Sequence, residues 1–415
     1  MKTFLQAHAA HADAEKALAQ AGAQIEAQRR LPGRATHPTL GWLYLTDHYA
    51  AQAEWLLAQV QQRWPGVAWV GAVGIGVAAG CQEHFDTPAL SLMLAELPVD
   101  RFHVFSGARP LGDFAAHTAQ VHADPSTEDL AELIKDMSQR TTTGYLFGGL
   151  AAARNRALHI AQDVLQGGLS GVAFDKSVAL VSRVTQGCQP VGPLRTVTGA
   201  DGNVITELDG EPALNCLLRD MALAEDSDPR EALPHLRQTL VGLSDRRATD
   251  ARHHSRFYTP ARHGAFGSDT RVRNLIGLDP TRRGVAIAES AGPGLQITFC
   301  TRNTEAARRD LMRICAEIRD EVESEIALAP RALAQAPGPD SHADTRAAVV
   351  PAGIAGAIYV SCTGRGGPHF GGPSAELAVV RHALGDVPLA GFFAAGEIAR
   401  HHLYGYTGVL TVFRS

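Results

Sequence analysis

What this chain of 415 residues lacks excludes several classes of protein. Its six cysteines are scattered and form no CxxC pair, so they provide neither a disulfide framework nor a zinc ribbon. No apolar run approaches the roughly 20 residues of a membrane-spanning helix, and the N-terminus lacks the apolar core of a signal peptide. A net charge of −5 gives no general case for nucleic-acid binding. We therefore expect a cytoplasmic protein without membrane insertion or a nucleic-acid partner.

The composition that is present is that of a globular protein, with 45% hydrophobic and 20% charged residues. Strand and helix patterns alternate in the first half, and hairpin signals follow in the second. These patterns predict an α/β fold with mixed sheets and flanking helices. The predicted domains are an N-terminal helix over 1–34, a first domain over 35–190 and a second over 191–415.

The predicted elements follow from hydrophobic periodicity and from turn residues. Helices are expected over residues 5–28, 49–63 and 375–384, after a Ser126/Thr127 cap, and from an N-cap at Thr304 to about residue 328. Strands are expected over 40–45, 67–70, 90–97, 102–105, 171–184 and 357–361, with hairpins over 196–208 and 284–300. Residues 330–347 are rich in Pro and Ala and predict a flexible insertion. Residues 244–273 hold seven arginines and three histidines, which is typical of a solvated loop or of a patch that grips an anion.

A weak internal repeat links the two ends of the chain. VAWVGAVGIG (67–76) and VPLAGFFAAG (387–396) each place a second glycine five residues after the first, and each follows a strand and a helix. Such glycines permit a sharp turn or the close approach of a ligand or a second backbone. The GxGxxG spacing of a dinucleotide site is absent. The repeat predicts two related, pseudo-symmetric halves with a cleft between them, where ligand sites often lie.

The segment SCTGRGGPHFGGPSAE (361–376) holds the strongest candidate for chemistry. Exposed backbone N–H groups around Gly364 and Gly366 together with the Arg365 guanidinium form a good cradle for a carboxylate. Cys362 beside an arginine would have a lowered pKa and some nucleophilicity. The alternative is a buried cysteine followed by an ordinary glycine turn.

The order of several motifs resembles the FIST family. CTGRG, the downstream Phe370, VPLAGFFAAGEI and YTGVLTVF are similar to the C-terminal part of a FIST domain. VRNLIGLDP, GLQITFCTRNTEAARRDL and VTGADGNVITELDGEPAL fit the same family, and GWLYLTDHYAAQAEWL…WVGAVGIGVAAG and YLFGGLAAAR resemble its N-terminal half. The resemblance spans roughly residues 35–413. The sequence departs from the family in HLYGYT, where an Asn/His pair is usual, and in the longer 330–347 segment.

The resemblance implies a bacterial cytoplasmic sensory module of two parts, FIST-N and FIST-C. Such modules bind a small ligand, with amino acids as the proposed class, and this chain would signal through a separate partner such as a histidine kinase. Arg365 would bind the anion, and Glu397 would bind an ammonium group or stabilise a helix N-terminus. The predicted ligand-binding residues are Gly71, Gly74, Cys362, Thr363, Gly364, Arg365, Gly366, Gly391, Gly396, Glu397 and Thr407.

Three other functions stay open at this point. Some stand-alone family members are haem proteins that sense nitric oxide, and His84, His103, His369, His401 and His402 are the candidate axial ligands. Haem would be bound non-covalently, since no CxxCH motif exists. A hydrolase or transferase would use Cys362 as nucleophile and His369 or His401 as base, although no GxSxG or HExxH motif supports an enzyme. A scaffold that binds only protein partners is the last alternative. We favour a non-enzymatic sensor and predict no metal site.

Overall fold

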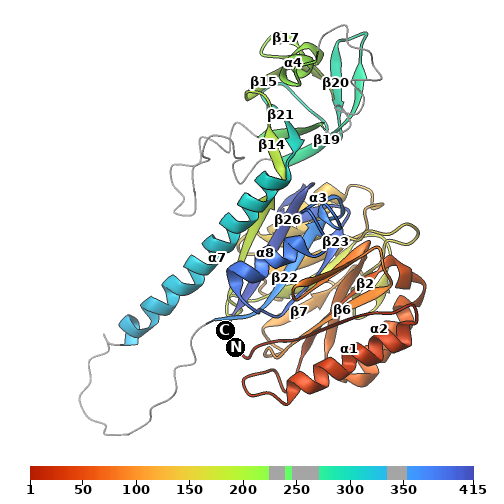
Figure 1. The fold of residues 1–415 in the computed structure, drawn as a ribbon, viewed down its shortest axis with the longest axis vertical. Coiled ribbons are helices and arrows are strands. Elements are labelled where there is room, and N and C mark those ends of the chain that lie inside the picture. The colour runs from red at the N-terminus through yellow and green to blue at the C-terminus, as the bar shows by residue number, and fades with distance from the viewer. Residues whose placement is uncertain (224–238, 245–270, 334–352) are drawn as a thin grey trace. The chain divides into compact units, whose positions relative to one another are not determined.

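The computed structural model describes residues 1–223, 239–244, 271–333 and 353–415, and for residues 325–333 it describes the backbone. The chain forms two compact units (Figure 1). Unit 1 comprises residues 1–185, 311–402 and 408–415, and unit 2 comprises residues 186–310 and 403–407. The sequence division after residue 190 stays a prediction. Much of the predicted 330–347 insertion and of the arginine-rich 244–273 segment lies outside the described residues.

Unit 1 contains three six-stranded mixed sheets within the described residues. Their strand orders are β1-β6-β2-β3-β10-β11 (sheet B), β13-β26-β22-β23-β4-β5 (sheet C) and β25-β24-β9-β8-β12-β7 (sheet D). The strands are β1 (Leu5–Ala10), β2 (Leu40–Thr46), β3 (Ala68–Gly74), β4 (Gly76–Ala79), β5 (Gln82–Phe85), β6 (Ala89–Ala95), β7 (Phe102–Phe105), β8 (Thr118–Ala123), β9 (Leu146–Leu150), β10 (His159–Ala161), β11 (Val164–Leu165), β12 (Leu169–Phe174), β13 (Leu180–Gln186), β22 (Ile354–Cys362), β23 (Leu389–Ala394), β24 (Glu397–Arg400), β25 (His402–Tyr404) and β26 (Thr407–Arg414).

One strand–helix–strand unit occurs three times in unit 1. Each copy consists of two parallel neighbours joined through a helix: β2 and β3 through α2 (Ala53–Arg63), β8 and β9 through α3 (Leu130–Gln139), and β22 and β23 through α8 (Ala375–Leu384). The sequence predicted the first and third copies as a pair. The second copy makes the repetition threefold, so the repeat extends beyond two related halves.

The hairpin that follows each copy pairs with a different sheet. β4 and β5 follow β3 of sheet B but join sheet C beside β23. β10 and β11 follow β9 of sheet D but join sheet B beside β3, and β24 and β25 follow β23 of sheet C but join sheet D beside β9. The strand after each hairpin returns to its own sheet, as β6 returns to β2. Every sheet therefore depends on a hairpin from another copy.

A glycine in the second parallel strand of each copy lets the two strands approach closely. Gly71 lies opposite Leu43, and Gly391 lies opposite Tyr359. A Cβ atom would stand 1.8 Å from the Leu43 carbonyl oxygen at the first position and 1.7 Å from the Tyr359 oxygen at the second. These glycines thus allow the close approach of a second backbone, one of the roles proposed from the sequence.

Helices cover the outer face of sheet B. The amphipathic helices α1 (Ala14–Arg29) and α2 pack their apolar side chains on this sheet, and both run along it in Figure 1. The core between them includes Leu43, Leu45 and Trp69. Asp13 caps α1 by accepting hydrogen bonds from the backbone N–H groups of Glu15 and Lys16. The η1 segment (Asp47–Gln52) is a 3₁₀-helix that precedes α2.

Unit 2 has a separate core and a separate sheet. Its described strands follow the order β14-β21-β15-β16-β20-β19-β18, with β17 beside β16, and α4 (Ala213–Asp220) packs on them. The bounds are β14 (Cys188–Pro190), β15 (Arg195–Asp201), β16 (Val204–Leu208), β17 (Glu211–Pro212), β18 (Thr239–Ser244), β19 (Arg271–Asp279), β20 (Gly284–Ile287) and β21 (Gln296–Arg302). The helix α7 (Thr304–Leu333) begins in unit 2 and continues into unit 1.

Several predictions of local structure were wrong. Residues 171–184 do not form one strand, because β12 ends at Phe174 and β13 begins at Leu180. Residues 5–10 form strand β1 rather than helix, because alternate side chains are buried and the backbone pairs with β6. The predicted hairpin over 284–300 does not form, since β20 pairs with β16 and β19 whereas β21 pairs with β14, β15 and β18. The cap residue of α3 is Asp129, and Asn303 rather than Thr304 precedes α7 and accepts a hydrogen bond from the Ala306 N–H. The hairpin of β15 and β16 is confirmed.

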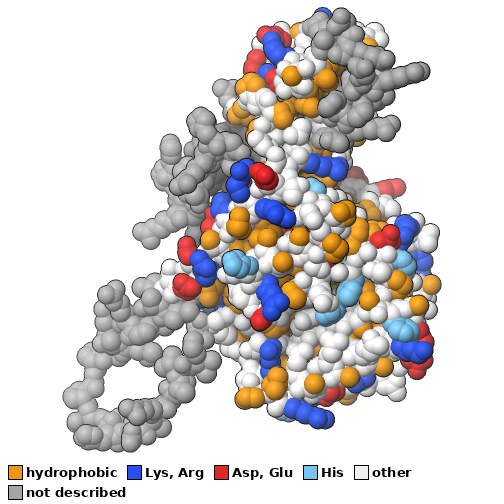
Figure 2. All heavy atoms as spheres, viewed as in Figure 1, with side chains coloured by type: hydrophobic (Ala, Val, Ile, Leu, Met, Phe, Trp, Pro, Cys, Tyr) orange, Lys and Arg blue, Asp and Glu red, His pale blue; other side chains and the backbone are white. Residues whose placement is uncertain are grey.

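The surface gives no sign of a dominant charge on the face shown in Figure 2. Acidic and basic side chains are intermixed there, and hydrophobic side chains lie scattered among polar atoms. Among the described residues, no helix is long and apolar enough to cross a membrane.

Candidate functional site

The structure brings several predicted site residues together at the carboxyl ends of β22 and β23. Cys362 ends β22 and is followed by the single 3₁₀ turn η3 (Thr363–Arg365). The Thr363 hydroxyl donates a hydrogen bond to the carbonyl of Ala394 in β23, at 2.7 Å. Glu397 begins β24 three residues after β23 and is fully buried. Parallel strands of α/β sheets often bind ligands beyond their carboxyl ends.

Arg365 is held by a buried carboxylate of the protein itself. Its guanidinium is 1% exposed and lies 2.6 Å from Oε1 of Glu376 in α8. The same carboxylate accepts hydrogen bonds from the Tyr359 hydroxyl at 2.6 Å and the Ser361 hydroxyl at 2.9 Å. Burial alone would lower the pKa of Arg365, but Glu376, Tyr359 and Glu397 outweigh it and raise the pKa above its usual value. Arg365 therefore stays charged at any ordinary pH.

A second carboxylate covers the glycine loop. The Gly367 N–H donates a hydrogen bond to Glu83 of β5 at 3.1 Å, and the Glu83 N–H donates to the Ser374 hydroxyl oxygen at 3.0 Å. A Cβ on Gly366 would lie 2.1 Å from the Phe85 ring. Burial raises the pKa of Glu83, assisted by the charge of Glu376. Two carboxylates of the protein thus occupy part of the anion cradle that the sequence predicted.

The other predicted site residues lie in different surroundings. Gly71 and Gly391 are equivalent positions within two different sheets, where each faces the backbone of its neighbouring strand. Gly74 ends β3 close to the Phe393 backbone, since a Cβ there would stand 2.9 Å from the Phe393 oxygen. Thr407 is buried and belongs to unit 2. The predicted site as a whole stays a prediction.

The described residues can be searched for disulfides and for clusters of metal-ligating side chains. All six cysteines lie in described parts of the chain and carry thiols rather than disulfides. Within those parts, no group of three or more His, Cys, Asp or Glu side chains is placed to hold a metal ion.

Sequence reasoning missed a pocket of about 300 Å³ in unit 1. It is lined by residues of β1, of the end of α1 and the segment after it, of the β4–β5 hairpin, of β22, of the end of α8, and of the loop from α8 to the start of β23. Its polar lining consists of Gln6, His8, Gln28, Arg34, Gln82, Arg381 and Asp386, beside Cys81. The two arginines are 347 positions apart in the sequence, so no local motif signals the pocket.

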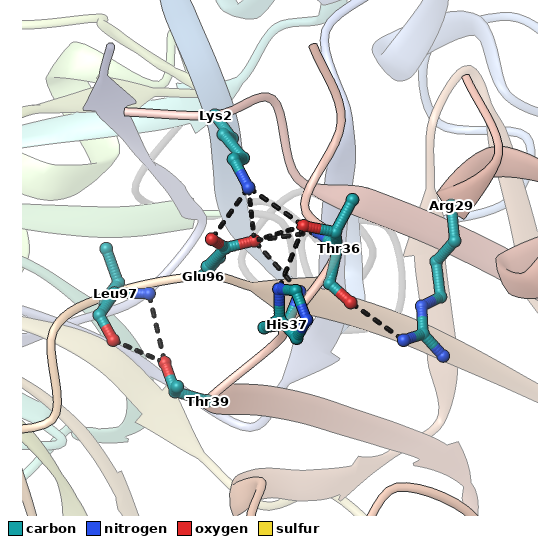
Figure 3. A network of polar contacts seen from close by, with 7 residues as sticks. All are labelled: Lys2, Arg29, Thr36, His37, Thr39, Glu96 and Leu97. Carbon is teal, nitrogen blue, oxygen red and sulfur yellow. Dashed lines mark hydrogen bonds and ion pairs between the residues drawn. The ribbon is translucent and has the colours of Figure 1, made fainter. Parts of the chain in front are cut away.

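The segment that carries Arg34 is fixed by a network around Glu96 (Figure 3). The Glu96 carboxylate accepts hydrogen bonds from the N–H groups of Thr36 at 2.7 Å and His37 at 2.9 Å, and pairs with Lys2 at 2.8 Å. Arg34 Nη1 donates to the Phe4 carbonyl at 3.0 Å. These contacts order the chain before β2 and hold the Arg34 side chain at the pocket.

Contacts at the end of α8 orient the second arginine. Arg381 Nε lies 2.6 Å from a carboxylate oxygen of Asp386, and Arg381 Nη1 donates to the Cys81 sulfur at 3.5 Å. The Arg381 side chain is half exposed and Asp386 is 80% exposed. Both charges can therefore exchange a protein partner for a ligand.

His8, which lines the pocket, is paired with a second histidine. His8 Nδ1 lies 2.8 Å from His84 Nε2, so one ring donates a hydrogen bond to the other. Burial lowers the pKa of His8, and burial together with His8 lowers the pKa of His84 to about 4. Both imidazoles are consequently neutral at pH 7.

The fold and these sites define a mixed α/β protein in which an interrupted threefold strand–helix–strand repeat carries a buried charged cluster and a polar pocket of about 300 Å³. Comparison with known families matches the FIST N domain over residues 39–211 and the FIST C domain over residues 213–400. This chain belongs to the FIST family, whose domains are small-ligand sensory domains. The boundary between the two matched regions falls within unit 2.

Relatives of similar length support the same membership. An uncharacterised protein of Mycobacterium tuberculosis (strain ATCC 25618 / H37Rv) is 32% identical over 419 aligned positions, covering 97% of each chain. An uncharacterised protein of Mycobacterium bovis (strain ATCC BAA-935 / AF2122/97) is 30% identical and covers 97% of this chain and 96% of its own. The similarity therefore extends over both FIST domains.

Proposed function

We propose that this protein is a sensor that binds an amino acid or a small anion and signals through a separate protein, such as a histidine kinase. The observation that supports it is the gathering of Arg365, Glu376 and Glu397, all at most 1% exposed, around the carboxyl ends of β22 and β23. An amino acid requires receptors of both charges a few ångströms apart. This part of unit 1 supplies a guanidinium and carboxylates.

Ligand binding at this position requires an exchange of partners. Glu376 holds Arg365 at 2.6 Å, and Glu83 holds the Gly367 N–H at 3.1 Å. An incoming carboxylate would replace one of these protein carboxylates, and the displaced carboxylate could then bind the ligand ammonium. Such an exchange would move α8 or β5, which gives a partner protein a structural change to detect.

The test is a thermal-shift screen of amino acids and small anions, followed by calorimetric titration of each hit. A bound ligand raises the unfolding temperature by mass action. Arg365→Ala is a poor variant, because removal of one partner of a buried ion pair costs about 3–5 kcal/mol. The double variant Arg365→Gln/Glu376→Gln removes both charges together and leaves polar side chains that can hydrogen-bond to each other. Arg109→Gln is the matched control, since Arg109 forms a half-exposed ion pair with Asp163 in the same unit.

We expect the double variant and Glu397→Gln each to weaken binding by about tenfold or more, the effect of losing one charged hydrogen bond. Arg109→Gln should bind as the wild type does. Comparison of an amino acid with its N-acetyl derivative then separates amino-acid binding from anion binding. If a ligand binds the double variant and Glu397→Gln as tightly as it binds the wild type, this placement of the site is wrong.

A further inference from the structure

We propose that the pocket lined by Arg34 and Arg381 binds a small organic monocarboxylate. This site shares no residue with the one proposed at the ends of β22 and β23, and it does not depend on that proposal. All of the residues that line it belong to unit 1. Its volume of about 300 Å³ is at the lower end of the range for small-molecule sites.

The charges of the lining favour a monoanion. Arg34 and Arg381 contribute two positive charges, Asp386 contributes one negative charge, and His8 is neutral because burial lowers its pKa. Arg34 gives Nη1 to the Phe4 carbonyl, which leaves its other N–H groups for a ligand. The planar guanidinium fork matches the two oxygens of a carboxylate.

A buried amide supplies an independent observation. The side-chain nitrogen of Gln6 is buried and has no hydrogen-bond partner among the described residues. The neighbouring Gln28 is engaged with the Gln6 backbone: its side-chain nitrogen donates to the Gln6 carbonyl, and its side-chain oxygen accepts from the Gln6 N–H at 3.1 Å. A buried donor without an acceptor is costly. Gln6 also lines the pocket, so a rotation of its amide would bring this donor to a ligand oxygen.

Much of the remaining lining is hydrocarbon, which favours an organic ligand. Val380, Leu384 and Leu389 present hydrocarbon to the pocket, together with Ala79 and Ala357. Inorganic phosphate would leave these groups facing a strongly hydrated ion. A carboxylate with a short hydrocarbon body places its charge at the arginines and its apolar part against the wall.

The experiment uses the full chain and a series of probes: acetate, butyrate, hexanoate and benzoate, with butyramide and inorganic phosphate as comparison ligands. Binding is measured by calorimetric titration at pH 7 with the wild type, Arg34→Gln, Arg381→Gln, Glu397→Gln and the control Arg109→Gln. Arg34→Lys keeps the positive charge if Arg34→Gln folds poorly. Each Arg→Gln variant should bind butyrate roughly 10- to 100-fold more weakly, the usual effect of losing a charged hydrogen bond.

The proposal is supported if affinity rises from acetate to butyrate and falls in both pocket variants while Arg109→Gln is unchanged. It is overturned if butyramide or phosphate binds as well as butyrate, or if the pocket variants bind normally. Binding that is lost in Glu397→Gln but kept in Arg34→Gln overturns the pocket and supports the strand-end site. Butyrate binding that is lost only in the pocket variants supports the pocket, and the strand-end site is judged by the amino-acid titrations, so the two proposals fail separately.

Discussion

Several buried polar side chains of unit 1 bond to one another in the interior between its sheets. Trp42 Nε1 donates to Gln120 Oε1 at 2.6 Å, and Gln120 Nε2 donates to the Tyr44 hydroxyl at 2.7 Å. His122 lies 3.3 Å from the same hydroxyl, and burial lowers its pKa to about 3. In the third repeat the equivalent positions are Ile358 and Val360, as the pairing of Tyr359 with Gly391 shows. Two repeats thus supply hydrogen bonds where the third supplies hydrocarbon.

Glu96 should make the stability of the protein depend on pH. Burial alone would raise its pKa, but the His37 N–H, Lys2 and the Thr36 N–H lower the pKa from its ordinary value of 4.5 to about 2. Because the folded state lowers this pKa, the stabilisation is complete above about pH 4.5 and is lost as the pH falls towards 2. It amounts to about 2 kcal/mol once partial screening by solvent is allowed for.

We therefore expect Glu96→Gln to lower the free energy of unfolding by about 2 kcal/mol at pH 7, with the difference from wild type shrinking below pH 4.5. Urea unfolding from pH 7 to pH 3 measures it. Asp163→Asn provides the control, because Asp163 is 63% exposed and pairs only with the half-exposed Arg109 among the contacts described. A difference between wild type and Glu96→Gln that stays constant over this range would contradict the assignment.

At the scale of elements, the glycines of the parallel strands should be hard to replace. A Cβ on Gly148 would stand 1.9 Å from the Val121 carbonyl oxygen, and the residue has a φ of +144°. Gly148→Ala should lower the free energy of unfolding by about 3 kcal/mol or more, because the backbone must move. Gly107→Ala is the control, since nothing lies within 4 Å of its Cβ position. Chemical denaturation compares the two, and equal stabilities would contradict the close-packing argument.

The sequence contained enough to predict two of the three repeats but little about how they join. Apolar strands and helix periodicity are local, so β2, α8 and β22 were predicted within a few residues. The β8–α3–β9 copy escaped because its glycines, Gly148 and Gly149, are adjacent and do not fit the GxxxxG spacing. The hairpin exchanges and the pocket depend on pairings between residues hundreds of positions apart. Local sequence patterns do not predict such pairings.

The same limit applies to the candidate site. The sequence predicted that the CTGRG and AAGE segments belong together, and the Thr363–Ala394 hydrogen bond joins their neighbourhoods. It did not predict that Glu376 and Glu83 would occupy the donors, because each approaches through tertiary packing: Glu376 from α8 and Glu83 from a hairpin of another repeat. The sequence shows that Arg365 and the glycine N–H groups can donate hydrogen bonds. It does not show which carboxylates of the protein accept them in the folded state.

At the scale of the whole molecule, the exchanged hairpins tie the three sheets of unit 1 together. Sheet B ends in a hairpin from the second repeat, sheet C in one from the first and sheet D in one from the third. No sheet can unfold without losing pairing in another. Unit 2 is inserted between β13 and β22 of the third repeat and has a hydrophobic core of its own.

Unit 1 should consequently unfold in a single cooperative step, and the tryptophans allow a direct test. All four lie within residues 42–69, on or beside β2, α2 and β3, so their fluorescence reports on the first repeat. Val412→Ala lies in sheet C and should cost about 1–3 kcal/mol through the cavity it leaves. It should shift the urea midpoint seen by tryptophan fluorescence as much as the one seen by far-ultraviolet circular dichroism. Phe299→Ala, in the core of unit 2, should leave the fluorescence midpoint unchanged. If Val412→Ala left the fluorescence midpoint unchanged, the sheets would unfold separately despite their exchanged hairpins.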